Sequence, residues 1–101
     1  MDLKECRERI DVIDAQLAAL FTERMEVAEA VARYKIDHGM QVLDTAREAQ
    51  KLDKAETMVP AKEREGIREV FTLLMALSRR RQHELLQQAG PESGTEERDT
   101  Q

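Results

Sequence analysis

The chain has 101 residues, the length of a single domain, and its 37% charged and 3% aromatic residues favour exposed helices over a β-sandwich. A net charge of −5 excludes the broad basic surface with which proteins bind nucleic acids or anionic membranes. The N-terminal residues lack the apolar stretch of a secretory signal, no apolar run is long enough to span a membrane, and Cys6 has no second cysteine to pair with. We therefore predict an all-α protein in the cytoplasm, with residues 1–90 as one domain.

The first predicted helix runs from Leu3 to about His38, a stretch without proline or glycine. Gly39, followed by Met40, predicts a left-handed C-cap at its end. At 1.5 Å per residue this helix spans roughly 54 Å, whereas a compact 100-residue domain has a radius of gyration of only about 13 Å. Its apolar residues recur with heptad spacing: Leu3, Cys6, Ile10, Ile13, Leu17, Leu20, Val27, Val31 and Tyr34. These residues form an apolar stripe, the heptad stripe, that is longer than the other two helices of one chain can cover. We therefore predict a homodimer in which a second copy covers the rest.

Two cations stand on the inward side of the first helix. Arg24 occupies a position where the heptad pattern requires an apolar residue, and a cation there needs acidic partners from the protein or from a ligand. Lys35 follows about 20° around the helix and roughly 16 Å along it, so both side chains can bracket a small dianion. Arg7 lies some 25 Å from Arg24 and could serve only the pocket of an antiparallel partner. From spacing alone, Arg7 and Lys35 are better explained as edge residues of a coiled coil.

The second predicted helix begins after Asp44 and runs to about Met58, before a break at Pro60. Asp44 and Glu48 are one turn apart and share a face with Arg47 beside them, so they could hold a hydroxyl group. The pattern alone favours a structural role, with Asp44 as the N-cap and Glu48 complementing the helix dipole.

The third predicted helix runs from about Lys62 to Gln88 and is closed by Gly90 and Pro91. The segment 91–101 is polar and acidic without an apolar anchor, so we predict a disordered tail. The helix carries one apolar stripe, made of Ile67, Val70, Phe71, Leu74, Leu77 and Leu85.

Polar residues interrupt that stripe. Ser78 and Gln82, one turn apart, either bond to each other and to the backbone or line a polar cavity, and the pattern leaves both possibilities open. Arg79, Arg80 and Arg81 are most simply a solvated turn that complements the helix dipole.

The sequence offers little for metal or cofactor chemistry. Neither His38 nor His83 has further ligands at the spacing of a metal site, and Cys6 has no neighbouring cysteine or histidine. A Gly-rich phosphate loop and a nucleophile elbow are both missing from the sequence. We therefore expect neither a metal nor a cofactor.

Together these segments resemble the all-helical (AroQ-class) chorismate mutases. The resemblance covers about residues 3–88, in order and with the family's spacing, and it is carried by Arg7–Leu17, Glu23–Met25, Val31–Lys35, Asp44–Glu48 and Ser78 with Gln82. It implies an intertwined homodimer of three-helix chains that converts chorismate to prephenate without a cofactor. Each of its two active sites would take one arginine from the neighbouring chain.

The resemblance also implies how the carboxylates of chorismate are held. Arg24 of one chain and Arg7 of the other would clamp the two carboxylates, and Ser78 would help to hold one of them.

The remaining site residues would act on the ring hydroxyl and on the breaking bond. Glu48, with Asp44 and Arg47 close by, would engage the hydroxyl, while Lys35 and Gln82 would donate to the ether oxygen. Lys35, Gln82 and Glu48 are thus the expected catalytic residues.

Two other functions remain open on the same sequence. The first is a lyase on this scaffold that releases pyruvate from isochorismate, although the presence of both Asp44 and Glu48 favours the mutase. The second is a non-catalytic helical dimerisation module that activates a partner enzyme.

Overall fold

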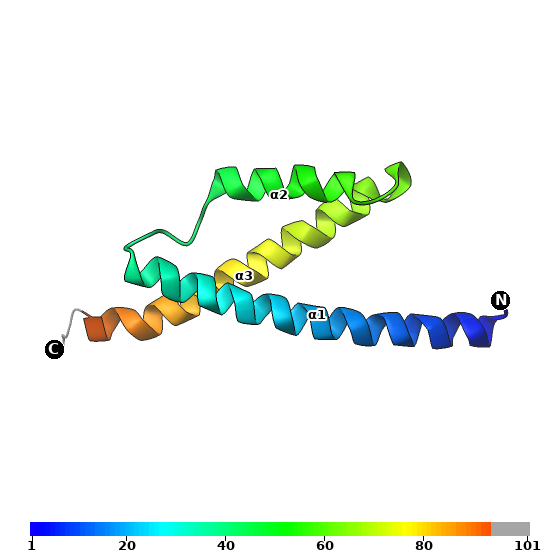
Figure 1. Ribbon diagram of the computed structural model, residues 1–101, viewed down its shortest axis with the longest axis horizontal. Helices are drawn as coiled ribbons and strands as arrows, with labels where there is room; N and C mark the ends of the chain where they lie inside the picture. The colour runs from blue at the N-terminus through cyan, green and yellow to red at the C-terminus, as the bar shows by residue number, and fades with distance from the viewer. Residues whose placement is uncertain (94–101) are drawn as a thin grey trace.

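The computed structural model describes residues 1–93, which form three α-helices and one short 3-10 helix (Figure 1). In chain order these are α1 (Leu3–Asp37), α2 (Thr45–Thr57), η1 (Ala61–Glu63) and α3 (Arg64–Ser93). The described part of the chain contains no strand. The predicted all-α fold class is therefore confirmed.

Both ends of α1 are fixed by local hydrogen bonds. At its start, the Asp2 carboxylate accepts from the backbone N–H of Glu5 at 2.8 Å while the Glu5 carboxylate accepts from the backbone N–H of Asp2 at 3.0 Å, a capping box. At its end, Gly39 has a φ of 64° and the Met40 N–H donates to the Lys35 carbonyl at 2.8 Å. This left-handed turn confirms the predicted C-cap.

The bounds of α2 also follow the prediction. An Asp44 carboxylate oxygen accepts from the backbone N–H of Arg47 at 3.0 Å, and so Asp44 is the N-cap. The helix ends at Thr57, next to Met58, and the chain then turns at Pro60 into η1.

The end of α3 differs from the prediction. The helix does not stop at Gly90 and Pro91 but continues to Ser93. Proline lacks the backbone N–H and removes one helical hydrogen bond, but the two residues after Pro91 are still helical. The rest of the predicted tail, residues 94–101, lies outside the described residues.

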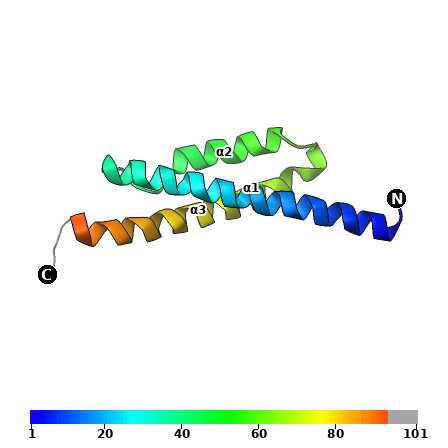
Figure 2. The ribbon, with the colours of Figure 1, turned by 60° about the horizontal axis from the view of Figure 1, so that its bottom comes forward.

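The three helices form an elongated molecule around α3. Helix α3 packs against both α1 and α2 and crosses the C-terminal half of α1, while the N-terminal part of α1 projects away from the other helices (Figures 1 and 2). The principal extents are 63 × 29 × 16 Å and the Cα radius of gyration is 18.3 Å. A globular domain of this length would have a radius of gyration of about 13 Å, so one chain is far from compact.

The buried core is small and is built from small or flexible side chains. Ala28 and Ala32 of α1, Ala55 of α2 and Met75 of α3 are buried, together with Val42 of the loop between α1 and α2. Alanines on α1 let the helix axes approach closely.

The heptad stripe of α1 is not part of this core. Large side chains along it remain exposed, among them Leu17 at 59% and Leu20 at 61%. The face of α1 that packs within the chain is the one that carries Ala28 and Ala32, so the apolar stripe is available to another surface.

None of the helices in residues 1–93 is long and apolar enough to cross a bilayer.

Candidate active site

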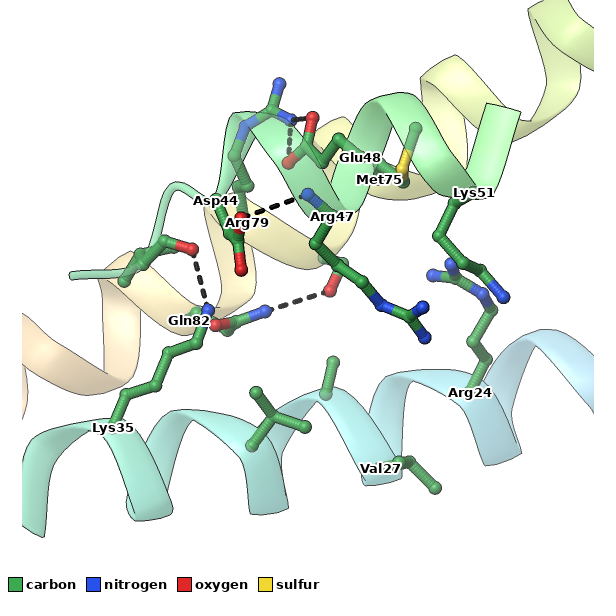
Figure 3. A pocket seen from close by; sticks show the side chains of 14 residues that line it. Arg24, Val27, Lys35, Asp44, Arg47, Glu48, Lys51, Met75, Arg79 and Gln82 are labelled. Atoms are coloured by element: carbon green, nitrogen blue, oxygen red, sulfur yellow. Dashed lines mark hydrogen bonds and ion pairs between the residues drawn. The ribbon is translucent and has the colours of Figure 1, made fainter. Parts of the chain in front are cut away.

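A cavity of about 290 Å³ lies between α1, α2 and α3 and is partly open to solvent (Figure 3). Its volume is close to the lower end of the range for small-molecule sites. Seven of the eight predicted site residues line it: Arg24, Lys35, Asp44, Arg47, Glu48, Ser78 and Gln82. The structure therefore brings together residues that are up to 58 positions apart, from Arg24 to Gln82.

The eighth predicted residue is remote from this cavity. Arg7 is exposed near the N-terminus of α1 and is not part of the cavity lining. Arg24 lies 17 positions further along the helix, about 25 Å along the axis.

Lys35 closes the end of the cavity next to the loop between α1 and α2. Its ammonium donates to the Val42 carbonyl at 2.7 Å (Figure 3). The loop thus fixes the position of the Lys35 ammonium. Because an ammonium has three protons, it can still donate further hydrogen bonds into the cavity.

Gln82 is the most deeply buried polar side chain of the described residues, with 6% of its surface exposed. Its amide nitrogen donates to the Ser78 hydroxyl at 3.1 Å, whereas its side-chain oxygen Oε1 has no partner. The two residues bond to each other and also line the cavity, so the predicted polar lining is present together with the side-chain bond. A buried amide with unused hydrogen-bonding capacity is costly unless a ligand completes it.

The arginine run of α3 is not a uniformly solvated turn, which corrects the prediction. Arg79 lines the cavity, where one of its guanidinium nitrogens donates to both carboxylate oxygens of Glu48 at 2.5 Å. Arg81 pairs with Glu29 of α1. Of the three arginines, only Arg80 makes no ion pair with the described residues, and it is exposed. The run was misread because its three members face different neighbours.

Asp44 combines its capping role with a place in the cavity wall. The oxygen that caps α2 belongs to a side chain that also lines the cavity next to Lys35 and Arg47 (Figure 3). A capping carboxylate retains lone pairs, so the cap does not prevent a contact with a ligand.

Lys51 is a cavity residue that the sequence interpretation missed. It lies one turn after Arg47 on α2, faces Arg24 of α1, and its pKa is lowered by burial and by the charges of Arg47 and Arg24. The spacing of 44, 47, 48 and 51 along one face of a helix was the signal that could have revealed it.

The cavity as a whole is positively charged. Five cations and two carboxylates line it, and one carboxylate, that of Glu48, is already bound to Arg79. Such a site attracts a small polyanion, and neutral donors from Ser78 and Gln82 give it directional contacts. Within residues 1–93, no three His, Cys, Asp or Glu side chains come together as a metal site would require.

A scan of protein families matches residues 6–83 to the family described as chorismate mutase type II. This match includes every residue of the cavity wall and also Arg7. Neither the curated proteins nor the solved structures yielded a match.

Proposed function

Since the chain belongs to the chorismate mutase type II family, we propose that it converts chorismate to prephenate in aromatic amino-acid biosynthesis. The observation that carries this proposal is a cavity in which the cations Arg24, Lys35 and Arg47 have no acidic partner within 4.0 Å among the described residues. Chorismate brings two carboxylates to such a site. The cavity also contains neutral donors and carboxylates for its ether and hydroxyl groups, namely Ser78, Gln82, Asp44 and Glu48, and apolar side chains for its carbon skeleton.

The carboxylates of chorismate bind to arginines. Arg24 holds one of them with the planar fork of its guanidinium, and the Ser78 hydroxyl adds a hydrogen bond. The second carboxylate binds to the partner's Arg7, because Arg7 of the same chain lies about 25 Å along α1 from Arg24.

Lys35 and Gln82 act on the ether oxygen. The rearrangement breaks one C–O bond and forms one C–C bond in a single step, without proton transfer, so no nucleophile or cofactor is needed. Negative charge grows on the ether oxygen as the C–O bond lengthens, and donors already fixed in a water-poor cavity stabilise it. The bond from Lys35 to the Val42 carbonyl provides such fixation for one donor, and the burial of Gln82 provides it for the other.

Glu48 and Asp44 hold the ring hydroxyl. A carboxylate has about four lone-pair sites, so Glu48 can accept from a hydroxyl while it stays bound to Arg79. Together with the arginines, this contact keeps chorismate in the folded conformer that places the reacting carbons near contact distance, which removes part of the entropic barrier.

The active unit is an intertwined homodimer. The exposed heptad stripe on α1 supports this proposal, because a solvent-facing row of large apolar side chains is unfavourable in an isolated chain. Burial against a second copy would cover Ile10, Ile13, Leu17 and Leu20 and would carry Arg7 of each chain to the other's cavity.

We place the enzyme in the cytoplasm, since its single cysteine, Cys6, is a free thiol and suits a reducing compartment.

The test is to incubate the purified protein with chorismate and to follow loss of its absorbance and appearance of prephenate. Arg24→Ala should abolish most of the activity, whereas the matched control Arg33→Ala, an exposed arginine of the same helix outside the cavity, should retain it. Release of pyruvate from isochorismate without prephenate formation would instead identify a lyase. Full biological function in Arg24→Ala would favour the non-catalytic dimerisation module.

A further inference from the structure

Lys51 lies in the wall of the cavity without any structural partner of its own. Its side chain extends from α2 toward Arg24 of α1, and Arg47 lies one turn before it (Figure 3). Among the described residues, Lys51 makes no side-chain hydrogen bond within 3.5 Å and no ion pair within 4.0 Å. Packing within the chain thus gives no reason for a cation at this position.

The acids of the cavity do not compensate these charges. Glu48 is engaged by Arg79 through both of its oxygens, and Asp44 caps α2 next to Lys35. The cluster of Arg24, Arg47 and Lys51 therefore converges on empty volume.

The three cations of this cluster repel one another. Burial lowers the pKa of the Lys51 ammonium, and the charges of Arg47, Arg24 and the nearby Lys54 lower it further. Like charges held together oppose folding unless an anion joins them. A ligand carboxylate between the three cations would remove this repulsion.

We propose that Lys51 is a further substrate-binding residue, which with Arg24 and Arg47 holds one carboxylate of chorismate at this end of the cavity. This rests on the proposed function for the identity of the ligand. A lysine ammonium is a compact point charge, so it adds attraction without the fixed orientation that Arg24 imposes. Its contact exists in the ground state and in the transition state alike, and such uniform binding lowers KM without raising kcat.

The experiment compares Lys51→Gln with the matched control Lys54→Gln, an exposed lysine on α2 outside the cavity. Steady-state kinetics should show KM for chorismate raised about tenfold in Lys51→Gln, with kcat changed less than about twofold. Lys51→Arg should restore most of the affinity, because it keeps the charge. Lys54→Gln should behave as the unmodified protein.

Calorimetric titration with a stable bicyclic dicarboxylic acid, shaped like the folded substrate, separates this proposal from the proposed function. Its affinity should fall about tenfold in Lys51→Gln, whether or not the protein turns over chorismate. An unmodified protein that binds the dicarboxylate in this Lys51-dependent way but forms no prephenate would overturn the mutase assignment and leave Lys51 as an anion ligand. Unchanged KM and unchanged dicarboxylate affinity in Lys51→Gln would overturn the role of Lys51. The role would also be overturned if the main effect of Lys51→Gln were dissociation of the dimer into single chains.

Discussion

One guanidinium nitrogen of Arg79 on α3 lies 2.5 Å from both carboxylate oxygens of Glu48 on α2. The pair is half-buried, with 31% of the Arg79 side chain and 23% of the Glu48 side chain exposed, and it joins two helices across one wall of the cavity. It determines where the Glu48 carboxylate points.

Removal of Arg79 should therefore affect both stability and turnover. We expect a double-mutant cycle of Arg79→Ala and Glu48→Gln to give a coupling energy of about 1 kcal/mol in urea unfolding. Arg79→Ala should also lower kcat/KM about tenfold, because the carboxylate loses its fixed orientation. The control is Arg80→Ala, an exposed neighbour. Equal kinetics of Arg79→Ala and Arg80→Ala would show that the pair has no influence on the reaction.

Lys35→Ala and Gln82→Ala should each lower kcat about 10² to 10³-fold, as expected when a donor to a developing negative charge is lost. Sedimentation and circular dichroism should show the same mass and helix content as the unmodified protein. Gln82→Glu keeps the volume but not the neutral donor at neutral pH, so it should be impaired as well. Near-normal turnover in any of these variants would contradict the assigned roles.

Arg7 and Arg24 should complement each other between chains. Arg7→Ala and Arg24→Ala homodimers should each be inactive, since every cavity then lacks one arginine. After an equal mixture has exchanged subunits, half of the dimers carry one intact cavity, so about a quarter of the full activity should return. If no activity returns although mass spectrometry of labelled chains shows exchange, Arg7 does not act on the partner's cavity.

Leu17→Asp should prevent dimerisation, because Leu17 is 59% exposed on the heptad stripe and a buried aspartate there would lack a partner. Light scattering should give about half the mass of the unmodified protein, and activity should fall with it. Thr22→Asp, at an exposed position of the same helix away from that stripe, serves as the control and should remain dimeric. A Leu17→Asp protein of unchanged mass would exclude the stripe as the interface.

Lys51→Gln should stabilise the ligand-free protein near neutral pH. Burial and the charges of Arg47 and Arg24 lower the pKa of Lys51 in the folded protein. The unfolded chain therefore binds the ammonium proton of Lys51 more tightly than the folded chain does. At any pH below the folded-state pKa, the charged ammonium opposes folding. The opposition fades as the pH rises toward 10.5, the unfolded-state value. The free energy of unfolding should rise by roughly 0.5 kcal/mol at pH 7, and the gain should shrink in alkaline solution. Urea unfolding of both proteins at the same concentration and at several pH values measures this gain in stability. A gain that does not change with pH would show that the charge of Lys51 is not its cause.

The features that the sequence predicted well are those set by neighbouring residues. The cap at Asp44 and the left-handed turn at Gly39 each depend on a few consecutive residues, so the starts and ends of α1 and α2 were predictable. Seven of the cavity residues were also found, because their spacing matches the family pattern.

The features that the sequence did not predict depend on contacts between distant segments. Arg79 and Glu48 are 31 positions apart, and three consecutive arginines give no local sign of which one turns inward. The heptad pattern likewise shows that α1 has an apolar face but not what covers it. The face buried within the chain instead carries Ala28 and Ala32, whose importance comes from their small size at the contact with α3.

The bond between the Lys35 ammonium and the Val42 carbonyl makes the connection between α1 and α2 an unsuitable place for protein engineering. Surface loops usually accept inserted peptides or new chain ends, but here the backbone itself serves as a ligand to a charged group. A graft between residues 38 and 44 would move that carbonyl and with it the ammonium. The turn around Met58 and Pro60, at the other end of α2 and outside the cavity lining, is the better location for an epitope or a fluorophore.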